Sequence, residues 1–386
     1  MYMTHRERVL TALHHEEPDR VPLDIGGSIN NLNDGIYRKV KDFLCIQGEI
    51  RPYRGLRTST FYDERVLEAL DVDTRHVWLN DPVEYRSLED PTFNPKDYTD
   101  DWGVVIKQVE GKGAFHTQPP LQGKGIDEIE QFTWPDTQNP VRVRGLEERV
   151  KRLTQENEYA IVANHLATAG LLEWGGFMRG TEQFFMDLLL EKELAHFLLD
   201  KINEVFMGLY DLFLSVAGPA LDILYWAEDY GSQTGLLVSK EIYREFFKER
   251  HAQLFRFIKQ RAPHVKIQFH SCGAVSELVP DLLDTGIDIL NPLQPLASGM
   301  DLDGLKKRYG KRLCFSGGID IQKALPGTIG EVEEEVKLRL KQLAPGGGYI
   351  VAPANHIQDN TPPENVVHLS KMVRKYGRYP LSVPVS

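Results

Sequence analysis

The sequence is poor in cysteine, with only Cys45, Cys272 and Cys314 among 386 residues. Three thiols in a chain of this length do not make a disulfide framework, so we expect a protein of the reducing cytoplasm. No uncharged apolar stretch approaches the roughly 18 residues that a membrane helix needs. The first residues also carry no apolar run of signal-peptide length. We therefore expect a cytoplasmic protein without a membrane span.

Positively charged residues are also fewer than negatively charged ones. The chain has 45 Lys and Arg against 56 Asp and Glu, which gives a net charge of −11. Binding to nucleic acid or to an anionic membrane surface needs clustered cations, so we expect neither kind of partner. Hydrophobic residues make up 41% and charged residues 26%, enough for a large core and a solvated surface. The composition is that of an enzyme-sized globular protein.

Short apolar runs alternate with amphipathic helical segments along the chain. Near-continuous Ile, Leu, Val and aromatic runs are expected for parallel strands that are covered on both faces. Eight such strand–helix units predict an α/β protein with a (β/α)8 barrel. An open doubly wound sheet is the alternative, and the absence of a GxGxxG turn after the first strand counts against it. The expected strands are residues 20–26, 74–80, 159–165, 223–229, 265–271, 287–293, 313–318 and 349–355.

Helix ends and one insertion complete the expected organisation. Ser239 predicts the start of one helix, and a second is predicted over 331–343. Thr361 begins a capping box with proline at the first helical position of the last helix. The segment of about residues 82–139 is rich in Pro, Gly, Asp and Thr, and we interpret it as an insertion with a small hairpin. The whole of residues 1–386 is expected to form a single domain.

Polar side chains follow most of the expected strands. In parallel α/β folds, catalytic groups collect outside the carboxyl ends of the strands. Strand ends also meet water and become polar for that reason alone, so the pattern is stronger than any single member. Its members are Asp24, Asn164, His165, Glu228, Asp229, His270, Cys272, Asn291, Asn355 and His356.

The segment His270-Ser-Cys272-Gly carries the most specific chemistry. Residues two apart in an extended segment project to the same face, so the imidazole and the thiol can converge on one point. Nitrogen and sulfur ligands suit Zn²⁺, whose catalytic sites use three protein ligands. A buried cysteine beside a hydrogen-bonded histidine is the structural alternative. Candidates for the third ligand are His356, Asn355, Glu228, Asp229 and Cys314.

Two further features have both a functional and a structural interpretation. Glu228 and Asp229 could bind a metal, orient a ligand or act as an acid or base, or one of them could cap the helix that follows. Arg179, in a Gly-flanked loop, could clamp a carboxylate bidentately or form a structural ion pair.

Several segments, taken in order, resemble the uroporphyrinogen decarboxylase superfamily, which also contains corrinoid-dependent methyltransferases. The resemblance implies a (β/α)8 barrel with its site at the carboxyl end of the strands. The segments are residues 6–22 (RERVLTALHHEEPDRVP), 175–182 (GGFMRGTE), 227–247, 269–273 (FHSCG), 315–320 (FSGGID) and 361–366 (TPPENV).

Departures from the decarboxylase pattern favour the methyltransferase branch. Family decarboxylases carry an Arg-rich segment near the N-terminus, whereas residues 22–35 contain no arginine. A substrate with many carboxylates needs cationic partners. The His-x-Cys-Gly segment is similar to the zinc motif of the methyltransferases. Where the decarboxylases place a histidine, and the thiol-methylating members a second cysteine, this chain has Asn355, so the resemblance leaves the adjacent His356 as the replacement, with Glu228 or Asp229 next.

These patterns predict a cobamide-dependent methyltransferase. It would move a methyl group from a small methylated substrate, such as an aryl methyl ether, to cob(I)alamin on a separate corrinoid protein, because the chain lacks a DxHxxG-type cobamide motif. His270, Cys272 and His356 would hold zinc, and Asp229 or Glu228 would bind or protonate the leaving group. The expected substrate contacts are Asp24, Asp81, Asn164, Arg179, Asn291 and Asn355.

Two alternatives stay open. One is a metal-free decarboxylase in which Asp81 or Asp24 stabilises a protonated intermediate. The other is a non-catalytic barrel that interacts with a cobamide. The oligomeric state is also open, with a homodimer among the options.

Overall fold

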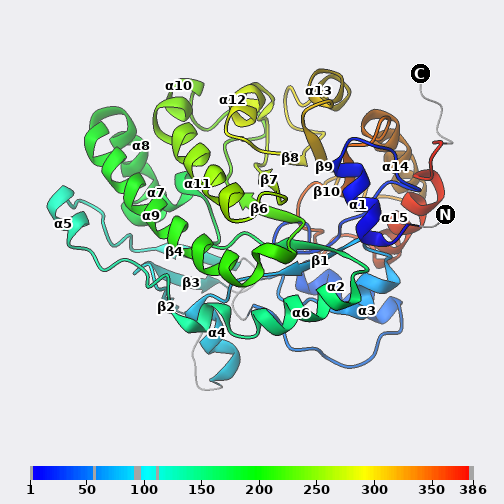
Figure 1. Ribbon diagram of the computed structural model, residues 1–386, viewed down its shortest axis with the longest axis horizontal. Helices are drawn as coiled ribbons and strands as arrows, with labels where there is room; N and C mark the ends of the chain where they lie inside the picture. Colours follow the sequence, from blue (N-terminus) through cyan, green and yellow to red (C-terminus); the bar gives the residue numbers. More distant parts are fainter. Residues whose placement is uncertain (1–2, 55–57, 91–96, 110–112, 382–386) are drawn as a thin grey trace.

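A seven-stranded parallel sheet forms the centre of the molecule, in the order β1-β5-β6-β7-β8-β9-β10. The structure, a computed structural model, describes residues 3–54, 58–90, 97–109 and 113–381. Figure 1 shows the sheet curled, with helices outside it on both sides. The strands are β1 (Thr74–Val77), β5 (Ala160–Ala163), β6 (Ile223–Ala227), β7 (Lys266–His270), β8 (Ile289–Leu293), β9 (Cys314–Ile319) and β10 (Tyr349–Pro353). Seven of the eight expected strands are thus present among the described residues, and they define an α/β fold.

The eighth expected strand, residues 20–26, is not assigned as a strand, so that prediction is wrong as stated. The segment makes only isolated bridges, one of them parallel, between Leu23 and Val351 of β10. Its backbone is nevertheless hydrogen-bonded on both sides. The Asp24 amide donates to the Val351 carbonyl at 2.9 Å, and the Asp73 amide donates to the Leu23 carbonyl at 2.9 Å. The run of paired residues is too short to count as a strand.

Helices follow most of the strands. They are α1 (His5–Leu13), α2 (Asp34–Phe43), α3 (Glu64–Ala69), α4 (Pro82–Glu89), α5 (Ile126–Glu130), α6 (Leu146–Glu156), α7 (Leu171–Arg179), α8 (Thr181–Leu190), α9 (Lys192–Ala217), α10 (Lys240–Ile242), α11 (Lys248–Arg261), α12 (Val279–Asp284), α13 (Leu302–Tyr309), α14 (Ile329–Leu343) and α15 (Pro363–Tyr376). Their apolar faces pack against the outer face of the sheet in one large cluster.

The predicted helix ends are partly confirmed. The Ser239 side chain accepts from the Ile242 amide, which confirms it as an N-cap, although a π-helical turn over Tyr243–Phe247 separates α10 from α11. The prediction over 331–343 corresponds to α14. The Thr361 capping box is wrong, because Pro362 takes the N-cap position and the helix begins at Pro363.

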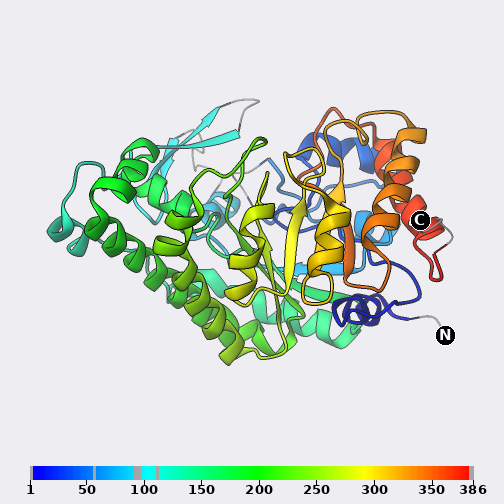
Figure 2. The ribbon, with the colours of Figure 1, turned by 90° about the horizontal axis from the view of Figure 1, so that it is seen from above.

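The predicted insertion contains a small antiparallel sheet as well as helices. Strands β2 (Asp97–Thr99), β3 (Val105–Val109) and β4 (Gly113–Thr117) pair in that order, with Ile106 opposite Tyr98 and His116. Figure 2 shows this sheet beside the carboxyl ends of the central strands, away from the chain termini. Part of the segment, residues 91–96 and 110–112, lies outside the described residues.

The amino and carboxyl ends of the central strands differ in what covers them. Inside the curled sheet, apolar side chains of its strands pack against Val9 and Leu13 of α1. The Arg6 amide donates to the Glu158 carbonyl just before β5, and the Gly348 amide just before β10 donates to the Ala12 carbonyl. Helix α1 therefore covers the amino ends of the strands, which leaves the carboxyl ends for a site.

The described helices include none with the length and hydropathy needed to span a membrane. The longest of them, α9, is apolar mainly on the side that it buries.

Candidate metal centre and cavity

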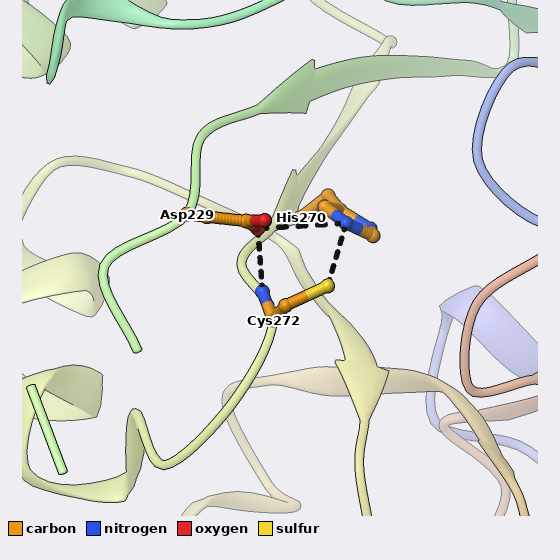
Figure 3. A group of neighbouring side chains, drawn as sticks. All are labelled: Asp229, His270 and Cys272. Carbon is orange, nitrogen blue, oxygen red and sulfur yellow. Dashed lines mark hydrogen bonds and ion pairs between the residues drawn. The ribbon is translucent and has the colours of Figure 1, made fainter. Parts of the chain in front are cut away.

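Three ligand-bearing side chains converge at the carboxyl ends of β6 and β7. The possible ligand atoms of Asp229, His270 and Cys272 all lie within 4.8 Å of one another. The Cys272 Sγ is 3.4 Å and the Asp229 Oδ1 is 3.7 Å from the His270 Nε2. Figure 3 shows the three side chains facing one another across this gap. A nitrogen, a sulfur and an oxygen ligand form the donor set of a catalytic zinc site, so the residues fit that metal.

Neighbouring groups hold each member of this triad in place. The His270 Nδ1 lies 2.6 Å from the Oδ1 of Asn291, which sets the ring so that its Nε2 faces the other two ligands. The Asp229 Oδ1 accepts from the Cys272 amide at 2.8 Å, and the Asn355 Nδ2 donates to the Cys272 Sγ at 3.1 Å. A polar partner on the second ring nitrogen is the usual support of a metal-binding histidine.

Burial sets the protonation state of His270 and Cys272, the two deeper residues of the triad. It lowers the pKa of His270, which keeps the imidazole neutral and able to bind a metal. Burial and, next, the Asp229 carboxylate raise the pKa of Cys272 well above its ordinary value. Metal binding at this site would therefore release the thiol proton.

The structure places Asp229, and not His356, next to His270 and Cys272. Among the described residues, the group of metal-ligand type includes neither His356 nor Glu228. Asn355 contacts the Cys272 sulfur, and the next side chain along the chain, His356, turns toward a different wall of the site, where burial lowers its pKa to about 4. Cys314 lies at the other end of the sheet, 3.6 Å from the Leu13 carbonyl oxygen.

Glu228, the other expected acid or base, is locked into a buried hydrogen-bond network. Its Oε2 lies 2.6 Å from the Nε2 of His251 and accepts from the Trp226 Nε1 at 3.2 Å. Its Oε1 accepts from the Leu172 amide at 2.5 Å. Both oxygens are therefore engaged in holding α7 and α11 against β6, which favours a structural role over proton transfer.

A cavity of about 230 Å³ adjoins the triad and is lined by Asp229, His270 and Asn355. Its aromatic lining is Tyr53, Trp78, Tyr85, Tyr98, Trp102 and Trp174. Its acidic lining is Asp81, Glu84, Asp100, Asp101, Glu173, Glu228 and Asp229. Pockets that bind drug-sized ligands measure roughly 300–1,000 Å³, so this cavity fits a smaller molecule.

The remaining predicted substrate contacts divide between this cavity and its surroundings. Asp81 and Asn164 line it. Asp24 is buried, with its Oδ1 accepting from the Thr74 Oγ1 at 2.6 Å, and Asn291 is buried against His270. The prediction for Arg179 is not supported, because its Nε donates to Asp187 at 2.8 Å and the guanidinium serves the structural ion pair instead.

Sequence reasoning missed most of the residues that line this cavity, among them Glu173, Ser28 and Arg54. Glu173 in α7 lines the wall and accepts from the Asp229 amide at 2.9 Å; burial, together with Glu228 and Asp229, raises its pKa well above the usual value. Ser28 and Arg54 also line the cavity. None of the three follows an expected strand directly, so the strand-end pattern offered no signal for them.

The fold and the site together define an α/β protein with a small-molecule cavity and a candidate metal centre at the carboxyl ends of a parallel sheet. The family comparison narrows this class. The profile of the uroporphyrinogen decarboxylase (URO-D) family matches residues 99–376. The chain therefore belongs to the URO-D family.

Two solved structures are similar to this chain to different degrees. A methyltransferase from Methanosarcina mazei shares 17% sequence identity, with a TM-score of 0.66, and the match covers 97% of this chain and 99% of that one. Xylanase 10B from Thermotoga maritima is 13% identical over 64% of this chain and 85% of its own, with a TM-score of 0.41. No curated protein matches the sequence. At such identities the methyltransferase match establishes a shared fold.

Proposed function

We propose that this chain is a zinc-assisted methyltransferase that passes a methyl group from a small methylated compound to cob(I)alamin on a separate corrinoid protein. The observation that carries the proposal is the convergence of Asp229, His270 and Cys272 beside a small cavity. The URO-D family match and the fold shared with a methyltransferase support it.

The chemistry needs a leaving oxygen, nitrogen or sulfur that is made less basic as the methyl group departs. Zinc, when bound, would supply a Lewis acid for this purpose. His270, Cys272 and Asp229 would hold it, and Asn291 would fix the His270 ring. The cavity wall next to them would orient the methyl group toward the open side, where the corrinoid partner would dock.

The cavity argues against the decarboxylase alternative. A tetrapyrrole with many carboxylates needs several cationic partners and a large pocket. The arginines that line the cavity are Arg54 and Arg142, and Arg142 is already paired with Asp101. At about 230 Å³ the cavity suits a much smaller substrate.

We infer that residues 21–24 take the eighth position of a closed (β/α)8 barrel, because their backbone is hydrogen-bonded to β10 on one side and to the residue before β1 on the other. Closure would fix the loops after all the strands around one mouth.

The choice of third ligand can be tested by two matched variants. Asp229→Asn should raise the dissociation constant for zinc on the order of 10- to 100-fold, because an amide is a poorer ligand than a carboxylate. His356→Ala should leave zinc affinity near that of the unmodified protein. Competition with a chromophoric chelator measures both values. The opposite ranking would make His356 the third ligand.

A further inference from the structure

One wall of the cavity carries buried polar atoms that have no hydrogen-bond partner within the described part of the chain. They are the Ser28 Oγ, the Arg54 Nε, the Asn164 Nδ2 and the His356 Nδ1. All four residues line the same cavity. We call this set the donor pole. Buried polar groups are nearly always satisfied in folded proteins, so a set of unpaired ones at a cavity points to a ligand.

The chemistry of the donor pole selects the kind of ligand group. An arginine Nε and an asparagine Nδ2 can only donate hydrogen bonds, so the ligand must accept them. The Asn164 amide orientation is fixed from its other side, where its Oδ1 accepts from the Ser28 amide at 3.2 Å and lies 2.8 Å from the His76 Nδ1. Its NH₂ group is therefore the end left for the ligand.

Charge at the donor pole favours an anion. The Arg54 Nη2 donates to the carbonyl and hydroxyl oxygens of Ser59 at 2.8 Å, and in the described ranges Arg54 forms no ion pair with a carboxylate. Arg142, the other arginine of the lining, is neutralised by Asp101. Arg54 is thus the arginine of this lining that has no carboxylate ion-pair partner among the described residues.

Three of the seven acidic side chains of the cavity are already hydrogen-bonded to other groups or partly neutral. Glu228 is paired with His251, and Asp229 is bound to the Cys272 amide in the metal group. Asp100 accepts from the Trp102 and Val104 amides, and burial raises its pKa to about 7. These carboxylates are committed to other partners or partly neutral.

The donor pole also adjoins the metal group. His356 follows Asn355, whose Nδ2 lies 3.1 Å from the Cys272 Sγ. Tyr53 packs 4.9 Å from the Arg54 guanidinium and 4.8 Å from the Trp78 ring. The Tyr53 and Trp78 rings, whose planes are tilted by 52°, therefore form an aromatic wall next to the donor pole.

We propose that the donor pole binds the carboxylate of the methyl donor, so that the substrate is a small methylated acid with the leaving atom that carries its methyl group at the Asp229–His270–Cys272 centre and its carboxylate at Ser28, Arg54 and Asn164. This inference rests on the proposed function for the identity of the reacting group. The carboxylate preference itself is a property of binding and can be measured without turnover.

The test compares two probes of nearly the same shape, 3-methoxybenzoate and its neutral amide 3-methoxybenzamide, by isothermal titration calorimetry with the full chain. The protein should bind the benzoate at least tenfold more tightly than the amide. Arg54→Gln should remove that preference, on the order of a 10- to 100-fold loss for the benzoate, because charge-assisted hydrogen bonds are lost. Arg54→Lys should retain part of it.

Two further variants make the outcome decisive. Arg38→Gln removes the same charge from an exposed position and should leave the preference intact. Asn164→Asp keeps the oxygen that faces Ser28 but replaces the donating NH₂, so it should weaken benzoate binding more than amide binding. Equal binding of the two probes, or an unchanged preference in Arg54→Gln, would overturn the proposal. Methyl transfer from a neutral ether such as anisole would then still report on the proposed function separately.

Discussion

Replacing Cys272 by alanine should remove most of the zinc from the purified protein and lower methyl transfer by more than the 10- to 100-fold typical of residues that only support a metal site. The unmodified chain should hold close to one zinc ion. The thiolate is the softest of the three expected ligands, and its loss would leave an imidazole and a carboxylate, which are too few for a catalytic zinc site. Metal analysis of the dialysed protein measures the effect.

Cys45→Ala is the matched control for this prediction. Cys45 is exposed and lies just beyond α2, so its loss should leave the zinc content unchanged. The Cys272→Ala variant should stay folded, since Cys272 lies in a loop at the end of β7 and contributes little to the core. Full zinc content in Cys272→Ala, or full activity of a metal-free protein, would remove this site from the mechanism.

The second large effect concerns stability. Glu228→Ala should lower the free energy of unfolding by about 3–5 kcal/mol, because it leaves the buried His251 Nε2 without its hydrogen-bond partner. The pair is fully buried, with 0% exposure of both side chains. The amide of Leu172 and the indole of Trp226 would also lose their acceptor. Urea denaturation followed by circular dichroism measures the change.

A surface carboxylate and an isosteric variant separate this role from catalysis. Glu204→Ala, at an exposed position of α9, should change stability by less than about 0.5 kcal/mol. If Glu228 instead donated the proton to the leaving group, Glu228→Gln would lower methyl transfer steeply while the protein kept its stability. That pattern would restore Glu228 as a catalytic residue.

Most of the sheet could be predicted from the sequence because buried parallel strands appear in it as local apolar runs. Every assigned strand of the central sheet except β9 lies inside its predicted range, and β9 ends one residue beyond its range. The prediction of a strand at residues 20–26 is wrong because this segment pairs only briefly, with Val351 and Asp73. Both partners are far away in the sequence, and the short bridge gives no long run of paired residues. Local patterns do not report such pairings.

The sequence predicts the two central ligands of the site but not the residues around them. His270 and Cys272 share one strand end, so strand geometry alone placed them together. Whether Asp229 or His356 joins them depends on how two loops turn after their strands, and no local pattern specifies that. Arg179 and Arg54 show the same limit, since each arginine's role is set by the carboxylate that does or does not lie beside it.

The most direct test of the central claim is methyl transfer to cobalt. The zinc-loaded protein is incubated anaerobically with cob(I)alamin and a panel of neutral and carboxylate-bearing methyl ethers, and the cobalt spectrum is followed. The account predicts conversion of cob(I)alamin to methylcobalamin that depends on His270 and Cys272. Release of CO₂ from uroporphyrinogen by the metal-free protein, with no methylcobalamin formed from any donor, would contradict it.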